Sequence, residues 1–249
     1  IADTLHFHRR EDTVLTLSPE LPGVSTENNL IIRAARLLQA YTGCPLGADI
    51  QLEKHLPLGG GLGGGSSDAA TTLLGLNSLW QLGLSLRELA QLGLQLGADV
   101  PVFVQGHSAW AEGVGEQLSP VLPPECWFFV LSPPTNINTA QIFQHPELTR
   151  NTPAITLAAF LQGGVSFPLR NDCEAVVKSL SPEVKNALSW LAHYGEARMT
   201  GTGACCFLIC SSKAEAENLL AQSPYPGFVA QGCNLSPAHR VLAQYQVSH

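Results

Sequence analysis

The residues most suggestive of chemistry are a run of glycines, six of the seven residues in Gly59–Gly65. Glycine loses more backbone freedom on folding than any other residue, so such a run is costly to order and is expected where another group must approach the backbone. The run lies between an alternating strand pattern and a long pattern of helix formers that opens at Ser66 and Ser67. Its N–H groups, together with those of the helix start, can point at one spot, which predicts an anion site.

Three other interpretations of this run fit less well. A flexible linker seldom separates a strand from a long apolar helix. A Walker loop would end in Gly-Lys-Ser/Thr, and no lysine occurs between Lys54 and Lys178. The glycines match GxGxxG, but a dinucleotide fold needs a fully buried strand before the loop and an acidic residue about 20 positions after it. Here the preceding strand alternates, and no acidic residue follows Asp68 until Glu88.

The elements that must position this loop follow from hydrophobic spacing and capping signals. Helices and amphipathic strands occur in mixed order, and a proline-rich break spans Ser119–Pro124, which predicts two α+β domains, 1–118 and 119–249. Helices are predicted at Leu30–Tyr41 before Gly43, from Ser66 to Trp80, after the Ser85/Glu88 capping box, from Pro182 to Gly195 and after Ser212; strands are predicted at Ala48–Leu52, Trp127–Leu131, Ala204–Cys210 and Gly227–Cys233.

The composition excludes several classes of protein. The 249 residues carry a formal net charge of −7, which speaks against a general nucleic-acid binder with its basic face. No apolar stretch is long enough to span a membrane, and the start resembles no secretory signal. The seven cysteines are odd in number and form no CxxC pair, so neither a disulfide framework nor a zinc site is predicted. Cys205, Cys206 and Cys210, in the apolar run Ala204–Cys210, are interpreted as small buried hydrophobes of a cytoplasmic protein.

The segment Pro57–Ala70 resembles the nucleotide-binding motif of the GHMP kinases. Leu96–Phe103, Asn171–Glu174 and Met199–Cys205 follow in the order and spacing of that family. The paired glycine triplets before Ser-Ser-Asp are similar to the family's branch in the non-mevalonate (MEP) isoprenoid pathway. The resemblance implies a two-domain α+β GHMP-kinase fold, an N-terminal ATP-binding domain and a C-terminal ferredoxin-like domain. It also implies transfer of the γ-phosphoryl group of ATP, with Mg²⁺, to the 2-hydroxyl of 4-diphosphocytidyl-2-C-methyl-D-erythritol.

The same resemblance assigns roles to individual residues. Asp99 is the implied catalytic residue at the acceptor, and Thr139 and Phe143 match positions at the cytidine end of the substrate. Asn29 and Lys54 match positions that line the adenine pocket, and the second glycine loop is expected to pack against the first. The implied ATP-binding set is Asn29, Lys54, Pro57, Leu58, Gly59, Gly60, Gly61, Leu62, Gly63, Gly64, Gly65, Ser66, Ser67, Thr200, Gly201, Thr202 and Gly203. No residue is assigned as a metal ligand.

Each of these residues also has a plainer interpretation. From the residues alone, Asp99 before Val100-Pro101 is a turn or cap residue, and Phe143 in a short helical pattern is a core residue. Lys54 is a solvated lysine at a strand end. Asp68 is predicted to lie in the first turn of its helix, where capping and the macrodipole explain it; a contact to Mg²⁺ through water is the alternative.

The start of the chain departs from the family. In the family, a first strand carries a catalytic lysine with a nearby asparagine, and a Gly-Tyr-His segment that holds cytosine follows it. Nothing of this kind precedes Asp3, and Asp3–Phe7 aligns with what comes afterwards. The expectation is therefore a sequence that lacks a few dozen N-terminal residues. A kinase of the same family with another acceptor, such as homoserine or mevalonate, and a non-catalytic nucleotide-binding module remain as alternatives.

Overall fold

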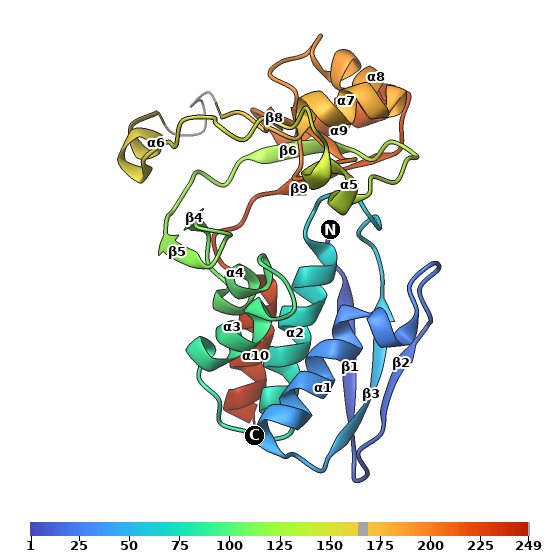
Figure 1. The fold of residues 1–249 in the computed structure, drawn as a ribbon, viewed down its shortest axis with the longest axis vertical. Helices are drawn as coiled ribbons and strands as arrows, with labels where there is room; N and C mark the ends of the chain where they lie inside the picture. Colours follow the sequence, from blue (N-terminus) through green and yellow to red (C-terminus); the bar gives the residue numbers. More distant parts are fainter. Residues whose placement is uncertain (164–168, 249) are drawn as a thin grey trace. The chain divides into compact units, whose positions relative to one another are not determined.

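The chain divides into two compact units in the computed structural model, which describes residues 1–163 and 169–248 (Figure 1). The N-terminal unit contains Ala2–His55, Gly63–Leu122 and the chain from Cys233 onward. The C-terminal unit contains Ile1, Leu56–Leu62 and Pro123–Gly232. This differs from the predicted division at 118/119, because the last helix belongs to the N-terminal unit and part of the glycine loop belongs to the C-terminal unit.

The N-terminal unit contains a three-stranded sheet in the order β1-β3-β2. Strand β1 (Thr4–Arg10) runs antiparallel to β3 (Gly47–Glu53), and β2 (Leu15–Ser18) runs parallel to it. The predicted alternation in β3 is confirmed, since Ala48, Ile50 and Leu52 are buried in the core. A short 3₁₀ turn, η1 (Thr26–Asn28), leads into the first helix.

Helices on one face of this sheet form the core of the N-terminal unit with it (Figure 1). They are α1 (Leu30–Thr42), α2 (Gly64–Leu79), α3 (Leu86–Leu94), α4 (Val100–Gln105) and α10 (Pro237–Ser248). Gly43 ends α1 in the left-handed conformation, and the capping box of Ser85 and Glu88 begins α3, both as predicted. A hairpin of β4 (Ala109–Glu112) and β5 (Gln117–Pro120) follows α4.

The C-terminal unit is built on an antiparallel sheet in the order β7-β8-β6-β9. Its strands are β7 (Arg198–Met199), β8 (Cys206–Cys210), β6 (Trp127–Leu131) and β9 (Gly227–Gln231). Its helices are α5 (Thr139–Gln144), α6 (Leu157–Gly163), α7 (Glu174–Leu180), α8 (Pro182–Leu191) and α9 (Lys213–Gln222).

The core of the C-terminal unit lies between one face of this sheet and helices α7, α8 and α9. Cys205, Cys206 and Cys210 are buried, as predicted, and burial raises the pKa of the Cys206 thiol to about 12. Helix α8 ends at Leu191, short of the predicted Gly195. No helix in the described part of the chain is both long and apolar enough to cross a membrane.

Candidate functional site

Helix α2 begins inside the glycine run, two residues before the predicted start at Ser66. Its N-cap is Gly63, which has a φ of 69° and contributes no capping side chain. A β-carbon at Gly63 would lie 3.0 Å from the Phe103 ring of α4. Asp68 is therefore the fifth residue of α2, and its predicted place in the first turn is wrong. Asp68 does not cap the helix, because its carboxylate has a charged partner outside α2.

That partner is Lys54, which follows β3 and lies between two carboxylates. Its Nζ is 2.7 Å from Asp68 Oδ2 and 2.6 Å from Asp3 Oδ2. Asp3 Oδ1 also accepts a hydrogen bond from the backbone N–H of His55, at 2.7 Å. All three charged side chains are largely buried, with 13% of Lys54, 3% of Asp3 and 6% of Asp68 exposed. The interpretation of Lys54 as a solvated strand-end lysine is wrong, while its place at the adenine stays a prediction.

Burial raises the pKa of Asp68 to about 6, because desolvation of its carboxylate outweighs the attraction of the Lys54 ammonium. The carboxylate of Asp3 adds to this rise in pKa, since two negative charges share one cation. The pKa of Lys54 is also raised. Desolvation of the ammonium lowers this pKa, but its hydrogen bonds to Asp3 and Asp68 raise it by more. The three residues thus tie β1, the end of β3 and the start of α2 together.

A raised carboxyl pKa makes the folded chain less stable as the pH rises. The folded chain binds the Asp68 proton more tightly than the unfolded chain does, so stability falls as pH rises from about 4 to about 6. Asp68→Asn removes this titration. We expect its free energy of unfolding, relative to wild type, to increase by about 2 kcal/mol between pH 4 and pH 7, since the limit is about 1.4 kcal/mol per unit of pKa shift and part of it is already present at pH 4.

Denaturant unfolding at several pH values checks this expectation. Glu27→Gln is the matched control, because Glu27 forms an exposed ion pair with Arg36 that lowers its pKa, so its difference from wild type should not rise with pH. A difference between Asp68→Asn and wild type that stays constant over this range would contradict the account of the buried cluster.

The first and second glycine loops are in direct contact within the C-terminal unit, as predicted. Thr200 Oγ1 donates to the carbonyl of Gly60 at 2.7 Å, and Cys205 N donates to the same oxygen at 3.1 Å. The contact leaves no space for side chains. A β-carbon at Gly61 would lie 2.5 Å from the carbonyl oxygen of Thr200 and 2.8 Å from that of Gly203.

These hydrogen bonds orient the peptide planes of the first loop. The carbonyl of Gly59 accepts from Ala204 N at 3.3 Å, and the carbonyl of Gly60 accepts from the second loop. In a trans peptide the C=O and N–H groups point in opposite directions. The N–H groups of Gly60 and Gly61 therefore point away from the second loop. Two successive N–H groups that point the same way can donate hydrogen bonds to one anion, such as a phosphate.

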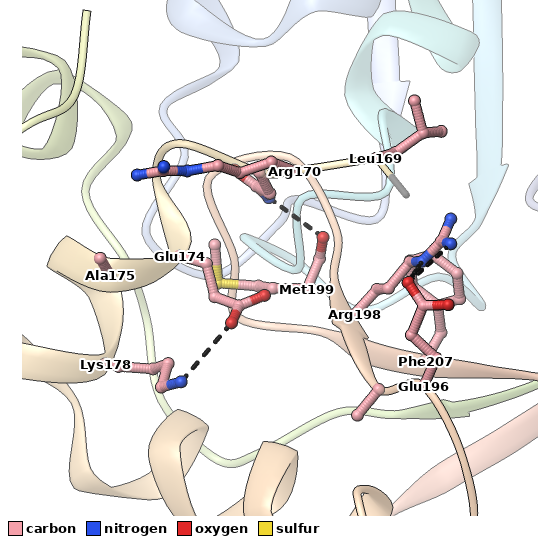
Figure 2. Close-up of a pocket in the computed structure, with 11 residues that line it drawn as sticks. Leu169, Arg170, Glu174, Ala175, Lys178, Glu196, Arg198, Met199 and Phe207 are labelled. Atoms are coloured by element: carbon pink, nitrogen blue, oxygen red, sulfur yellow. Dashed lines mark hydrogen bonds and ion pairs between the residues drawn. The ribbon is translucent and has the colours of Figure 1, made fainter. Parts of the chain in front are cut away.

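Sequence reasoning gave no role to Asn171, which holds the second loop. Its Nδ2 donates to the carbonyls of Met199 and Gly201, at 3.1 and 2.7 Å. It lines a pocket of about 490 Å³ behind the loop (Figure 2). Figure 2 shows Glu174 paired with Lys178 and Glu196 paired with Arg198 in this pocket. Its third cation, Arg170, pairs with Asp172. Because all three cations are paired, the phosphates are not assigned to this pocket. The signal for Asn171 was the family-like segment Asn171–Glu174.

Asp99 is exposed and immediately precedes α4, in the N-terminal unit. Although it holds the N-cap position, its side chain makes no capping hydrogen bond to the helix. The plain interpretation as a turn or cap residue is therefore confirmed for its position, in a turn at the N-cap, but its carboxylate makes no capping hydrogen bond. Within the same unit, Gly97 lies beside the Ser66 hydroxyl, so the loop before α4 meets the start of α2.

The remaining predicted residues are found in both units. In the C-terminal unit, the hydroxyls of Thr139 and Thr202 are 2.9 Å apart, which joins the predicted cytidine end to the second glycine loop. Phe143 is 57% exposed, so its interpretation as a core residue is wrong. In the N-terminal unit, Asn29 is buried and caps α1, where its Oδ1 accepts from Ile31 N at 2.9 Å.

Comparison with known proteins decides the family. The profile of the GHMP kinase N-terminal domain matches residues 29–107, and that of the GHMP kinase C-terminal domain matches residues 156–224. A protein of Chromohalobacter salexigens named 4-diphosphocytidyl-2-C-methyl-D-erythritol kinase is 55% identical over 245 residues, which cover 97% of this chain and 82% of that protein. This chain belongs to the GHMP kinase family. A Haemophilus influenzae protein of the same name is 53% identical over 97% of this chain and 76% of its own length.

Solved structures agree with this family and with the predicted fold class. A crystal structure of 4-(cytidine 5'-diphospho)-2C-methyl-D-erythritol kinase has a TM-score of 0.76 at 30% identity, over 92% of this chain and 85% of its own. A homoserine kinase from Cytophaga hutchinsonii has a TM-score of 0.67 at 14% identity, over 95% of this chain and 87% of its own, which shows the shared fold alone. As a GHMP kinase the chain is an ATP-dependent phosphotransferase, and the predicted α+β fold is confirmed.

Proposed function

We propose that this GHMP kinase transfers the γ-phosphoryl group of ATP to the 2-hydroxyl of 4-diphosphocytidyl-2-C-methyl-D-erythritol, a step of the MEP route to isoprenoid precursors in the cytoplasm. The observation that carries the proposal is 55% identity, over 97% of the chain, to a relative named for this substrate. Solved structures named as homoserine or mevalonate kinases match this chain at 14% to 16% identity.

ATP fits the residues around the first glycine loop. The N–H groups of Gly60 and Gly61 share one orientation, and the absence of side chains at both positions lets the second loop pack closely enough to hold that orientation. Bound Mg²⁺ would neutralise charge on the phosphates. No group of three metal-ligating side chains occurs in the described ranges, which suits an ion bound mainly through phosphates and water.

The catalytic role falls to Asp99. Phosphoryl transfer needs little covalent participation by the protein, so its task is to position the acceptor and accept the proton of its hydroxyl. A carboxylate that is exposed and makes no hydrogen bond to its own helix can do both. Thr139 and Phe143 are assigned to the cytidine end of the acceptor, where an exposed aromatic ring offers a stacking surface for a base.

The assignment of Phe143 predicts a selective defect. Phe143→Ala is expected to raise KM for the cytidyl substrate about tenfold or more, since base–aromatic stacking is worth about 1–3 kcal/mol. KM for ATP should stay within about twofold of wild type. Leu161→Ala, another exposed apolar side chain of the C-terminal unit, is the control. Equal effects of the two variants in steady-state kinetics would remove Phe143 from the substrate site.

The acceptor itself is tested with a panel of alcohols. The wild-type protein, expressed from its complete coding sequence so that any residues preceding Ile1 are included, is assayed for ADP release with the cytidyl substrate, homoserine and mevalonate at equal concentration. The proposal expects kcat/KM for the cytidyl compound to exceed the others by at least about a thousandfold, because a site built for polar groups rejects molecules that lack them. A higher kcat/KM for homoserine or mevalonate would contradict the proposal and assign the chain to another branch of the family.

A further inference from the structure

The last segment of the chain, which the sequence patterns did not predict as a helix, covers the end of α4. In Figure 1, α10 lies beside α2 within the N-terminal unit. The chain before α10 forms a short antiparallel bridge, in which Ser108 N donates to Asn234 O at 3.1 Å and Ser236 N donates to Gly106 O at 2.8 Å. The C-terminal segment is thus fastened to the residues that follow α4.

The closest contact is between Gly106 and His239. Gly106 ends α4 in the left-handed conformation, with a φ of 71°, and a β-carbon there would lie 2.2 Å from His239 Cδ2. The His239 Nε2 atom is 2.9 Å from the carbonyl oxygen of Val104, in the last turn of α4. A carbonyl only accepts, so Nε2 carries the hydrogen in this contact. His239 therefore satisfies a carbonyl that the helix end leaves without an intrahelical partner.

Helix α4 depends on such contacts because it is only six residues long. A helix of this length is not stable by itself, so its position is set by what it packs against. At its first residue, Val100 packs against Gly93 of α3 so closely that a β-carbon at Gly93 would lie 2.7 Å from Val100 Cγ1. At its last turn, His239 and Gly106 fix it. Asp99 directly precedes this helix, so a shift or fraying of α4 moves its carboxylate.

We propose that the contact of His239 with Gly106 and Val104, which we call the α10 latch, positions Asp99 for phosphoryl transfer. The proposal rests on the catalytic role proposed for Asp99. His239 is a positioning residue: it acts through α4. The latch should affect the chemical step more than the binding of ATP, because Asp99 directly precedes α4. Phe103 of the same helix packs beside Gly63 of the first glycine loop, so a small change in the affinity for ATP is also expected.

The test compares four chains at full length: wild type, His239→Ala, His239→Gln and Val241→Ala. Gln carries an amide N–H near the position of the histidine Nε2–H, so it tests rescue of the hydrogen bond. Val241 is 65% exposed on the same helix and is the matched control. We expect kcat of His239→Ala to fall between about ten- and a hundredfold with both KM values within about twofold, because misplacement by about 1 Å has this effect. His239→Gln should recover most of kcat, and Val241→Ala should equal wild type.

Amide hydrogen exchange of residues 100–106 provides a second readout that needs no turnover. Exchange there should be at least about tenfold faster in His239→Ala than in wild type or Val241→Ala. Unchanged kcat, or a fall in kcat that only mirrors a smaller folded fraction, would overturn the proposal, as would unchanged exchange in α4. If wild type fails to phosphorylate the cytidyl substrate, the proposed function is wrong, while the exchange of α4 still decides whether the latch holds the helix.

Discussion

Replacement of Asp99 by Asn is expected to lower kcat by at least about a hundredfold while the affinity for ATP stays within about twofold of wild type. The amide keeps the size of the side chain but cannot accept the proton of the acceptor hydroxyl, and such proton transfer contributes about 10²- to 10⁴-fold. Because Asp99 makes no capping hydrogen bond to α4, the variant should keep the stability of the helix. Steady-state kinetics and calorimetric titration with ATP measure the two quantities.

A matched control for Asp99→Asn is Asp172→Asn, which changes another carboxylate at the edge of a short helix. Asp172 pairs with Arg170 in the C-terminal unit, and no catalytic role is proposed for it. Its turnover should stay near that of wild type. Turnover of Asp99→Asn within about threefold of wild type would remove Asp99 from the mechanism, whatever its effect on stability.

The second large effect is expected from Gly61→Ala. A β-carbon at this position would lie 2.5 Å from the carbonyl oxygen of Thr200, and the φ of 70° disfavours any side chain. The two glycine loops must then separate, which turns the N–H groups of the first loop away from their common direction. We expect the affinity for ATP to fall between about ten- and a hundredfold, as measured by calorimetry.

Gly83→Ala is the control that distinguishes the effect of backbone strain from the effect of the contact between the two glycine loops. Gly83 has nearly the same φ, 68°, but nothing lies within 4 Å of a β-carbon there. Both variants carry the backbone cost of a left-handed side chain, about 1–2 kcal/mol. Only Gly61→Ala should lose affinity for ATP. Equal ATP affinities of the two variants would show that the contact of the loops does not shape the phosphate site.

Sequence patterns correctly predicted those helix ends and strand faces that depend only on neighbouring residues. The capping box of Ser85, the glycine after α1 and the alternation of β3 each act within a few residues, and the structure has all three. The contact of the two glycine loops was also predicted, although 140 positions separate Thr200 and Gly60, because the family resemblance carries long-range information.

Features that depend on distant partners were missed. Asp68 had the spacing of a helix-start residue, but it pairs with Lys54, which also binds Asp3, and neither contact leaves a periodic pattern in the sequence. The first turn of α2 was not predicted because it contains Gly64 and Gly65. Glycine has a low helix propensity, and here packing outweighs that propensity. Helix α10 is weakly amphipathic, and its docking through His239 is visible only in the structure.

Phosphorus NMR of the wild-type protein, expressed from its complete coding sequence, with ATP, Mg²⁺ and 4-diphosphocytidyl-2-C-methyl-D-erythritol tests the proposed reaction. We expect a new phosphomonoester resonance, from phosphate on the 2-hydroxyl of the acceptor, formed in equal amount with ADP and strongly reduced in Asp99→Asn. Consumption of ATP to ADP and inorganic phosphate without that phosphomonoester, or no consumption of ATP with this acceptor, would contradict it.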